Sequence, residues 1–518
     1  MRLGELVATL ALAQDNAFAQ PLESQLRSCL LAQWLAEETA PDQQLRDTVY
    51  WVALLRYIGC TGHAHEVATV FGDEMGIRAQ SLVHDAGNPA EVIGDVLAFA
   101  AAAHPPEVRE QVTQGILAGA HDWAVHNFAS GCEVGDMLAS RLGFESDVRD
   151  ALRFTFERWN GNGFPAGASG EQIPLAMRIV HVSQDMEAIA RRFSPARAIE
   201  ALSERRDSTY DPVLVDLFAV NASSWFERLE KVDPWDAVLA MEPVPYRTLA
   251  DADLDDALLV VADFIDLKSP FMSSHSRRCA DLAGDACVVL GLEADAAANV
   301  RRAALVHELG TTALSNAILD KPGPLTRAEM DRVRLHPMLT EQMLRRSPAL
   351  AELNAAAAAH HERADGTGYH KGVRLGMADP GGCVLSAVEI YVGLTTDRAD
   401  RPAVSESQAA AELRVLASEG VLNGDAVNAV LAAAGHVARS ASTPKRAELP
   451  GGLTRREVEV LVLAARGLST QQIGEALFIS PKTADHHIQH IYAKIGVSTR
   501  AAAALWAMQN SVLPDPRP

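Results

Sequence analysis

The chain has 518 residues, of which 48% are apolar, 22% charged and 5% aromatic. This length exceeds that of one hydrophobic core and the composition excludes a disordered chain, so we expect about three or four globular domains. The formal net charge is −21, but residues 451–518 carry seven Lys and Arg against five Asp and Glu, leaving 39 against 62 in residues 1–450. An acidic body repels polyanions, so nucleic acid is expected to contact only the C-terminal segment.

The sequence shows no segment typical of membrane insertion or secretion. Apolar runs such as residues 257–262 are interrupted by Asp263 and Asp266, far short of the roughly 20 residues of a transmembrane helix. The N-terminus lacks the pattern of a signal peptide. The six cysteines form no CxxC pair, which argues against a disulfide framework or a cysteine zinc site. We therefore expect a cytoplasmic protein with reduced thiols and no membrane partner.

The periodicity of the chain is helical. Alanine and leucine dominate, charges recur at spacings of three and four, and alternating β-branched stretches are scarce, which predicts an all-α fold. Residues 1–44 are expected to form an N-terminal helical segment. The sequence also contains an internal repeat. Glu157-Arg158 with Gly161, Gly163 and Gly167 recurs 205 residues later as Glu362-Arg363 with Gly366, Gly368 and Gly372. It predicts two related helical domains, at residues 45–235 and 250–438.

The first of these domains lacks an intact set of metal ligands. Thr155-Phe156 stand where the second domain has His360-His361. His84-Asp85 imitates a His-Asp pair, but it lies 73 residues before Glu157, against 55 residues from His307 to Glu362. We interpret that pair as a coincidence and expect residues 45–235 to serve as a packing or regulatory surface.

The second domain carries an ordered series of metal-ligand residue types, each in or beside an expected helix. They are His275, His307, Glu308, His336, His360, His361 and Glu389. Imidazole and carboxylate together suit divalent transition ions such as iron, manganese or zinc, and a carboxylate can bridge two ions. One histidine alone more often has a structural role, whereas this set indicates a metal site.

The motifs around these residues resemble the HD-GYP family of the HD phosphohydrolase superfamily over about residues 260–435. The matching segments are His-Ser-Arg-Arg (275–278), Ala-Leu-Val-His-Glu-Leu-Gly (304–310), Asp-Lys-Pro-Gly-Pro-Leu-Thr (320–326), His336-Pro337, His-His-Glu-Arg-Ala-Asp-Gly-Thr-Gly-Tyr-His (360–370), and Glu389-Ile-Tyr with Asp397-Arg398. Members of that family are helical, bind a two- or three-iron centre and act on cyclic di-GMP. The resemblance implies a divalent cofactor, Fe or Mn, a cyclic dinucleotide or other phosphate ligand, and attack on phosphorus by metal-activated water.

The domain also departs from that family. Glu308 replaces the paired aspartate, Thr311 the following lysine, His370 the proline of Gly-Tyr-Pro, and Glu389 and Val392 the late aspartates. Losing the lysine would cost roughly 1.5–3 kcal/mol, about one to two powers of ten in rate, and the added methylene of Glu308 alters a bridging position. The departures leave open an active phosphohydrolase, a metal- or ligand-sensing relative and a structural dimerisation body.

Residues 439–452 are rich in Ser, Pro and Gly and are expected to form a linker. Beyond it, residues 453–518 are expected to form a helix-turn-helix domain with helices at about 455–466, 470–478, 481–495 and 499–510. Capping boxes at Thr454 and Ser469 and the Ser480-Pro481 pair are typical helix starts, and Gly467 and Gly496 are typical helix ends.

The third of these helices has an apolar stripe opposite polar side chains. Gly-Leu-Thr-Arg-Arg-Glu-Val-Glu-Val-Leu (452–461), Ala-Arg-Gly-Leu-Ser (465–469), Ile-Ser-Pro-Lys-Thr (479–483), His487 and Lys-Ile-Gly-Val (494–497) resemble the LuxR-type DNA-binding domain. The resemblance implies that this helix enters the major groove of promoter DNA, that the fourth helix pairs in a homodimer, and that the contacts are Lys482, Thr483, His486, Gln489 and Lys494. Asp485 departs from the basic residue often found there, and a four-helix interaction module is the alternative.

Together the two resemblances favour a bacterial DNA-binding transcription regulator whose HD-GYP-like body senses a metal, a nucleotide or a protein. One alternative is an active metal-dependent phosphodiesterase for a cyclic dinucleotide, with the tail for localisation. Another is a scaffold without small-molecule chemistry. The sequence leaves catalysis open and assigns no catalytic residue.

Overall fold

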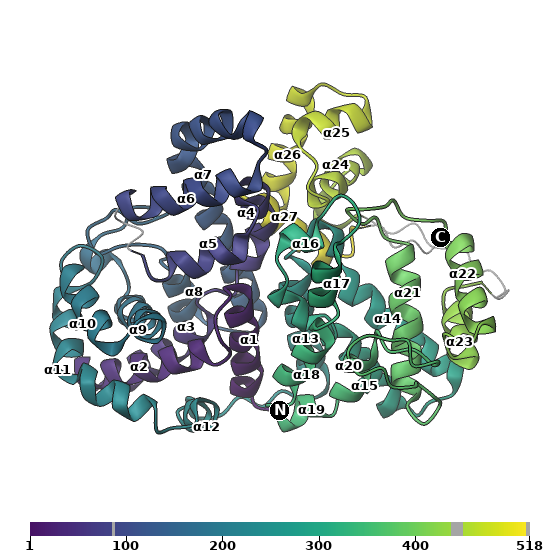
Figure 1. The fold of residues 1–518 in the computed structure, drawn as a ribbon, viewed down its shortest axis with the longest axis horizontal. Helices are drawn as coiled ribbons and strands as arrows, with labels where there is room; N and C mark the ends of the chain where they lie inside the picture. Colours follow the sequence, from purple (N-terminus) through teal and green to yellow (C-terminus); the bar gives the residue numbers. More distant parts are fainter. Residues whose placement is uncertain (85–88, 437–448, 514–518) are drawn as a thin grey trace. The chain divides into compact units, whose positions relative to one another are not determined.

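The computed structural model describes residues 1–84, 89–436 and 449–513. The regular structure of these residues is helical, with isolated β-bridges as the only extended pairings within the described ranges, which confirms the predicted all-α fold (Figure 1). The chain divides into two compact units: Met1–Leu254 with Ser315–Ala317, and Asp255–Leu314 with Ile318–Pro518. The predicted linker, residues 439–452, lies mostly outside the described residues.

The first unit is built from helices α1 to α12. Their bounds are Leu3–Ala17, Ser24–Thr39, Gln43–Leu55, Ala64–Phe71, Glu74–Ser81, Pro89–Ala103, Pro106–Arg141, Ser146–Leu152, Leu175–Arg192, Pro195–Glu204, Pro212–Leu229 and Pro234–Ala240, with short 3₁₀ turns at Cys60–His63 and Gly170–Gln172. Helices α2, α3 and α9 pack against one another and bury Leu30, Tyr50 and Ile179 almost completely. The helices of residues 1–44 therefore supply part of the core of this unit.

The second unit begins with helices α13 to α23, except that the first residues of α13 and of α16 belong to the first unit. Their bounds are Asp251–Asp266, His275–Leu290, Ala294–Val306, Asn316–Leu319, Arg327–Val333, His336–Leu344, Pro348–Ala351, Asn354–Ala359, Pro380–Leu394, Glu406–Ser418 and Gly424–Ala433, with 3₁₀ turns at Pro270–Met272 and Leu309–Ala313. Helix α14 packs against α15, α21 and α23, while α20 packs against α15, α18 and α21. These helices bring segments more than 100 residues apart around one buried centre.

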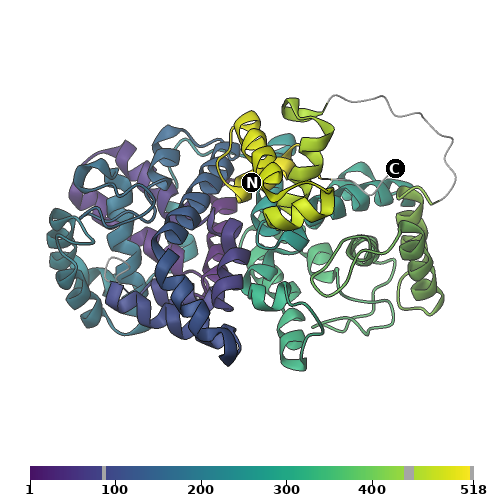
Figure 2. The same ribbon diagram turned by 90° about the horizontal axis from the view of Figure 1, so that it is seen from above.

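The C-terminal tail has a 3₁₀ turn at Pro450–Gly452 and helices α24 (Arg455–Ala465), α25 (Thr470–Leu477), α26 (Pro481–Ile495) and α27 (Arg500–Gln509), which form a compact cluster (Figure 2). All four predicted helices agree with these bounds to within one residue. The tail has its own hydrophobic core, to which Val460, Ile473, Ile488, Ile491 and Ala503 contribute.

Local chemistry sets the ends of the tail helices. Thr454 and Ser469 both form the predicted capping boxes, in which the hydroxyl accepts a backbone N–H and the residue three positions on bonds back. Ser480 caps α26 ahead of Pro481, and Gly496 ends that helix at φ 71°, where a side chain would be strained.

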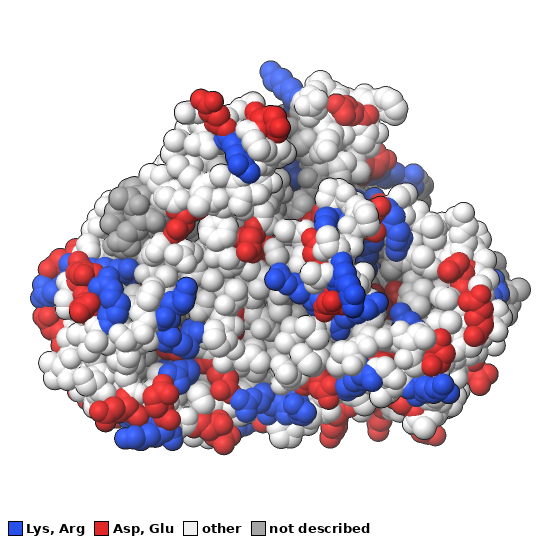
Figure 3. All heavy atoms as spheres, viewed as in Figure 1, with Lys and Arg blue, Asp and Glu red and all other residues white. Residues whose placement is uncertain are grey.

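On the face drawn in Figure 3, acidic and basic side chains are scattered in small groups among uncharged residues. Among the described residues, no helix combines the length and apolarity needed to cross a bilayer.

Candidate metal centre and DNA-binding face

The seven predicted metal ligands converge inside the second unit, where a cysteine joins them. They form two groups, each with donor atoms within 4.8 Å of one another: His275, Cys279, His307 and Glu389, and Glu308, His336, His360 and His361. All of these side chains are buried except His361, which is half-buried. The sequence predicted the members of both groups apart from Cys279.

Three of the histidines are held in the same way. His307, His336 and His360 each lie at a helix end, and the Nδ1 atom of each lies 2.7, 2.6 and 2.6 Å, respectively, from the carbonyl oxygen three residues earlier. A carbonyl oxygen only accepts, so each Nδ1 carries the proton and donates it. The Nε2 atom of each ring is thereby turned toward the centre, which is the arrangement that suits a metal ligand. Burial would lower the pKa of His307, but Glu389 and Glu308 outweigh burial and raise that pKa, so this ring favours a proton on Nε2 until an ion displaces it.

The short contact between His336 and His360 is not a favourable hydrogen bond when both rings are neutral. Their Nε2 atoms lie 2.9 Å apart, yet both atoms are acceptors when both Nδ1 atoms donate. Two nitrogen ligands bound at about 2.05 Å and at right angles on one ion are also about 2.9 Å apart. Burial, followed by the neighbouring histidines, holds the pKa of His360 well below its usual value, which disfavours a proton on that ring. The donor set therefore fits a divalent cation.

Glu308 links the two groups. Its Oε1 atom lies 4.0 Å from the Nε2 atoms of both His275 and His307, and its Oε2 atom lies 3.5 Å from Nε2 of His336. Among the described residues none hydrogen-bonds to the buried Oε2 atom. Two ligands of one ion with bonds near 2.1 Å are at most about 4.2 Å apart, so each oxygen is within reach of a different ion. The longer side chain of glutamate therefore lies between the two groups of donor atoms.

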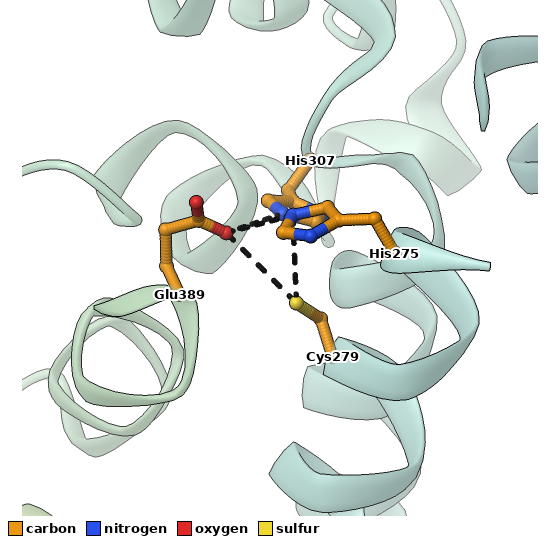
Figure 4. Close-up of side chains that lie close together, drawn as sticks. All are labelled: His275, Cys279, His307 and Glu389. Atoms are coloured by element: carbon orange, nitrogen blue, oxygen red, sulfur yellow. Dashed lines mark hydrogen bonds and ion pairs between the residues drawn. The ribbon is translucent and has the colours of Figure 1, made fainter. Parts of the chain in front are cut away.

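Glu389 is the acidic member of the first group (Figure 4). Its Oε2 atom lies 2.9 Å from Nε2 of His275 and 3.3 Å from Nε2 of His307. Burial alone would raise the pKa of Glu389, but the two histidines outweigh burial and hold that pKa well below its usual value. Arg398 lies 4.0 Å from the other oxygen and adds to the positive surroundings. An ionised carboxylate facing two imidazoles is a suitable donor set for a transition ion.

Two of the remaining departures from the HD-GYP pattern, Thr311 and Val392, are uncharged. Thr311 donates its hydroxyl to the backbone oxygen of Glu308 at 2.6 Å, where the family has a lysine. Val392 is buried. Tyr369 stacks on His361 with ring centroids 4.2 Å apart, so an aromatic face borders the half-buried ligand.

In the first unit, the same positions hold no comparable set among the described residues. The backbone oxygen of Thr155 lies 3.0 Å from Nε2 of His181 and accepts from Arg56 at 3.3 Å. His84 lies 2.7 Å from Asp95 as a partly exposed pair, while Asp85 lies outside the described residues. Neither segment forms part of a buried metal group.

The candidate DNA contacts lie on α26. Lys482, Thr483, His486 and Gln489 are exposed, whereas Ala484, Ile488 and Ile491 on the opposite side are buried in the core of the tail. In helix-turn-helix proteins the N-terminal part of the second helix reaches base edges, and Lys482, Thr483 and His486 lie in that part. This helix therefore presents a polar face to its surroundings.

Lys494, the fifth candidate, has a partner within the tail. Its Nζ atom lies 2.7 Å from Oε2 of Glu457 and 3.3 Å from the backbone oxygen of Gly452. Burial would raise the pKa of Glu457, but Lys494 and the capping bonds from Thr454 lower it to about 2. The ion pair joins α24 to α26, so Lys494 has a stabilising role that the sequence did not indicate.

Two families match separate parts of the chain. The HD domain matches residues 130–214 and 259–421, and the family described as "Bacterial regulatory proteins, luxR family" matches residues 452–507. The first match includes all seven predicted metal ligands, and the second includes the whole of α26.

Similar proteins are known for both parts. The chain is 28% identical over 412 residues to the 3'3'-cGAMP-specific phosphodiesterase 3 of Vibrio cholerae serotype O1, covering 79% of this chain and 90% of that protein. It is 42% identical over 69 residues to the response regulator protein VraR of Staphylococcus aureus, covering 13% of this chain and 33% of VraR. A crystal structure of a cyclic GMP-AMP-specific phosphodiesterase of V. cholerae matches with a TM-score of 0.58 at 25% identity, covering 84% of this chain and 97% of that one.

Proposed function

We propose a function for this chain from the two families that it joins, an HD domain and a C-terminal LuxR-type domain. The chain is a transcription regulator whose HD domain binds divalent ions and hydrolyses a cyclic dinucleotide, and whose tail binds promoter DNA. It acts in the cytoplasm as a homodimer. The observation that carries the enzymatic part is the position of Glu308, with one carboxylate oxygen facing each group of ligands.

The proposed centre has donors for two ions. His275, His307 and Glu389 would hold the first, His336, His360 and His361 would hold the second, and Glu308, between the two groups, would offer an oxygen to each. Iron or manganese suits these nitrogen and oxygen donors. Such ions, when bound, activate water and offset the charge of a phosphodiester. The chain's own contribution is to hold the Nδ1–H groups of His307, His336 and His360 on backbone carbonyl oxygens, so that the three Nε2 atoms face the centre.

The relatives support a cyclic dinucleotide as the substrate. The Vibrio cholerae protein is named for 3'3'-cGAMP, and its similarity covers 79% of this chain. Tyr369, stacked on His361, is suited to contact a nucleobase, since aromatic faces stack on bases without strong preference among them. We therefore propose 3'3'-cGAMP or a closely related cyclic dinucleotide.

The enzymatic part is tested with full-length protein purified without chelator. We expect about two transition ions per chain and a linear dinucleotide product from 3'3'-cGAMP or cyclic di-GMP. Glu308→Ala should lower metal content and turnover together, whereas Glu412→Ala, at an exposed position of α22, should change neither. Metal-free protein without turnover on either nucleotide would overturn the proposal and leave the scaffold alternative.

The DNA-binding part rests on the exposed polar face of α26. Lys482, Thr483, His486 and Gln489 are the proposed contacts, with Lys494 in support through its pair with Glu457. We expect Lys482→Ala and Gln489→Ala each to weaken selective DNA binding by about 1–3 kcal/mol, and Lys482→Ala also to reduce the salt dependence. Asn510→Ala, at the exposed end of α27, is the matched control. Absence of selective retention of any genomic fragment would exclude the regulator.

A further inference from the structure

Cys279 lies among the donor atoms of the first metal group. It is one turn after His275 on α14, and residues four apart on a helix lie on the same face. Its side chain is fully buried. The Sγ atom lies 3.6 Å from Nε2 of His275 and 3.9 Å from Oε2 of Glu389 (Figure 4). The thiol therefore faces the same point as the imidazole and the carboxylate.

The spacing of these atoms matches the edges of a tetrahedral site. Bonds of about 2.05 Å to nitrogen or oxygen and about 2.3 Å to sulfur, at tetrahedral angles, place nitrogen and oxygen ligands about 3.3 Å apart and nitrogen and sulfur about 3.6 Å apart. The corresponding distances are 2.9 and 3.3 Å from Glu389 to His275 and His307, and 3.6 Å from Cys279 to His275. These distances, and the 3.9 Å from Cys279 to Glu389, depart from the tetrahedral values by a few tenths of an ångström, and all four donor atoms lie within 4.8 Å of one another.

The two groups differ in chemistry because of this one sulfur atom. The second group offers imidazole and carboxylate donors, and its members include no cysteine. Cys287, two turns further along α14, is also buried but belongs to no such group among the described residues. A buried thiol is most often a small apolar side chain, and Cys287 fits that description. Cys279 differs because three other donor atoms surround the same point.

We propose that Cys279 is a ligand of the first ion and makes this a sulfur-containing site within the two-ion centre. The inference rests on the metal centre proposed above and extends it to a residue outside the predicted set. Binding replaces the S–H bond by a bond from sulfur to the ion, and the proton leaves to solvent. Thiolate favours softer ions such as Zn²⁺, Co²⁺ or Fe²⁺, whereas carboxylate and water suit Mn²⁺ and Mg²⁺. Cys279 would therefore bias the first position, and not the second, toward the softer ions.

Cobalt provides a direct test, because a sulfur-to-cobalt charge-transfer band in the near ultraviolet appears only when a thiolate is bound to the ion. Full-length protein freed of metal is titrated with Co²⁺, with bound cobalt counted by elemental analysis. We expect the band in the wild type, its loss in Cys279→Ser, and its retention in Cys287→Ser. In the same variants, Cys279→Ser should weaken Zn²⁺ binding by at least about 10-fold, since even loss of a supporting contact to a ligand typically costs about 10- to 100-fold. Binding of Mn²⁺ should change less.

The outcomes separate this inference from the proposed function. Cobalt bound without the band overturns the role of Cys279 and leaves the metal centre intact. No bound cobalt overturns both. A band that persists in Cys279→Ser assigns the sulfur elsewhere and also overturns the inference. If circular dichroism shows that Cys279→Ser does not fold, the wild-type band together with its retention in Cys287→Ser and Cys383→Ser still supports Cys279 as its source, whereas its loss in either of those variants overturns it.

Discussion

In the first unit a buried arginine stands where the second unit has His307, a candidate metal ligand. Arg56 directly follows α3 and His307 directly follows α15. The Arg56 guanidinium donates to Gln184 at 2.9 Å, and Gln184 is the tenth residue of α9, as Glu389 is of α21. The same pair of positions thus holds a guanidinium and an amide in one unit, and an imidazole and a carboxylate in the other.

The backbones around these positions are alike. Glu157 accepts two backbone N–H groups of its loop at 2.8 and 2.9 Å, and Glu362, 205 residues later, accepts the two corresponding groups at 3.1 Å. Asp15 and Asp266 each accept the backbone N–H of the second residue of the following helix, α2 or α14. The internal repeat in the sequence therefore corresponds to a repeated arrangement of loops and helix starts.

The comparison shows two ways to fill a buried polar centre. Arg56 is a fixed positive charge, and besides Gln184 it lies 3.7 Å from Asp185. The guanidinium of Arg56 thus provides the positive charge of the buried centre in the first unit, whereas bound ions are expected to provide it in the second unit. A centre filled in this way has no open ligand position, so we expect the first unit to contribute stability and the second to contribute chemistry.

We expect the largest difference between the two units when one candidate ligand is removed from the second unit. His360→Ala removes a proposed ligand of the second unit and should lower both metal content and cyclic-dinucleotide turnover, the latter by at least about 10⁴-fold, equivalent to about 5.5 kcal/mol. Thr155→Ala, at the corresponding position of the first unit, should leave metal content unchanged. Elemental analysis and product chromatography measure the two quantities. Equal loss of metal in both variants would show that the first unit also binds ions.

A smaller effect, on stability, is expected when Arg56 of the first unit is removed. Arg56→Ala leaves Asp185 buried without this partner, although Arg158 lies 3.7 Å from it. Removing one member of a buried ion pair typically costs about 3–5 kcal/mol, so the free energy of unfolding should fall by about that amount while metal content stays unchanged. Arg206→Ala is the matched control, because its exposed pair with Asp216 should contribute little to the free energy of unfolding. Urea unfolding measures both, and similar values for the two variants would contradict the role of Arg56.

The smallest effect concerns a feature that both units share. A Cβ atom on Gly59 would lie 1.9 Å from the backbone oxygen of Gly131, and one on Gly310 would lie 2.0 Å from that of His336. Each Gly→Ala variant should destabilise its unit by about 1–3 kcal/mol through overpacking, and Gly310→Ala should also weaken metal binding because His336 must move. Gly94→Ala has open space around it and should be neutral or stabilising. Thermal unfolding and metal content test these expectations, and metal loss in Gly59→Ala would argue against them.

Features that depend only on neighbouring residues were predictable from the sequence. Capping boxes and the Ser480-Pro481 pair fixed the starts of the tail helices to within one residue, because each signal lies within four residues of the atoms that it satisfies. The seven metal-ligand candidates were also found in the sequence, since the surrounding motifs resemble a known family. The domain boundaries at residues 44, 235 and 250 stay predictions.

Tertiary structure alone decided which of these residues meet. Cys279 is a candidate ligand because folding places it beside Glu389, 110 positions away. The position of Glu308 between the two groups of candidate ligands also follows only from the fold. The pairs of Arg56 with Gln184 and of Lys494 with Glu457 join residues 128 and 37 positions apart. Helical periodicity reports which face of a helix is buried, but it does not report what that face packs against. The contents of both buried centres were therefore fixed by long-range packing.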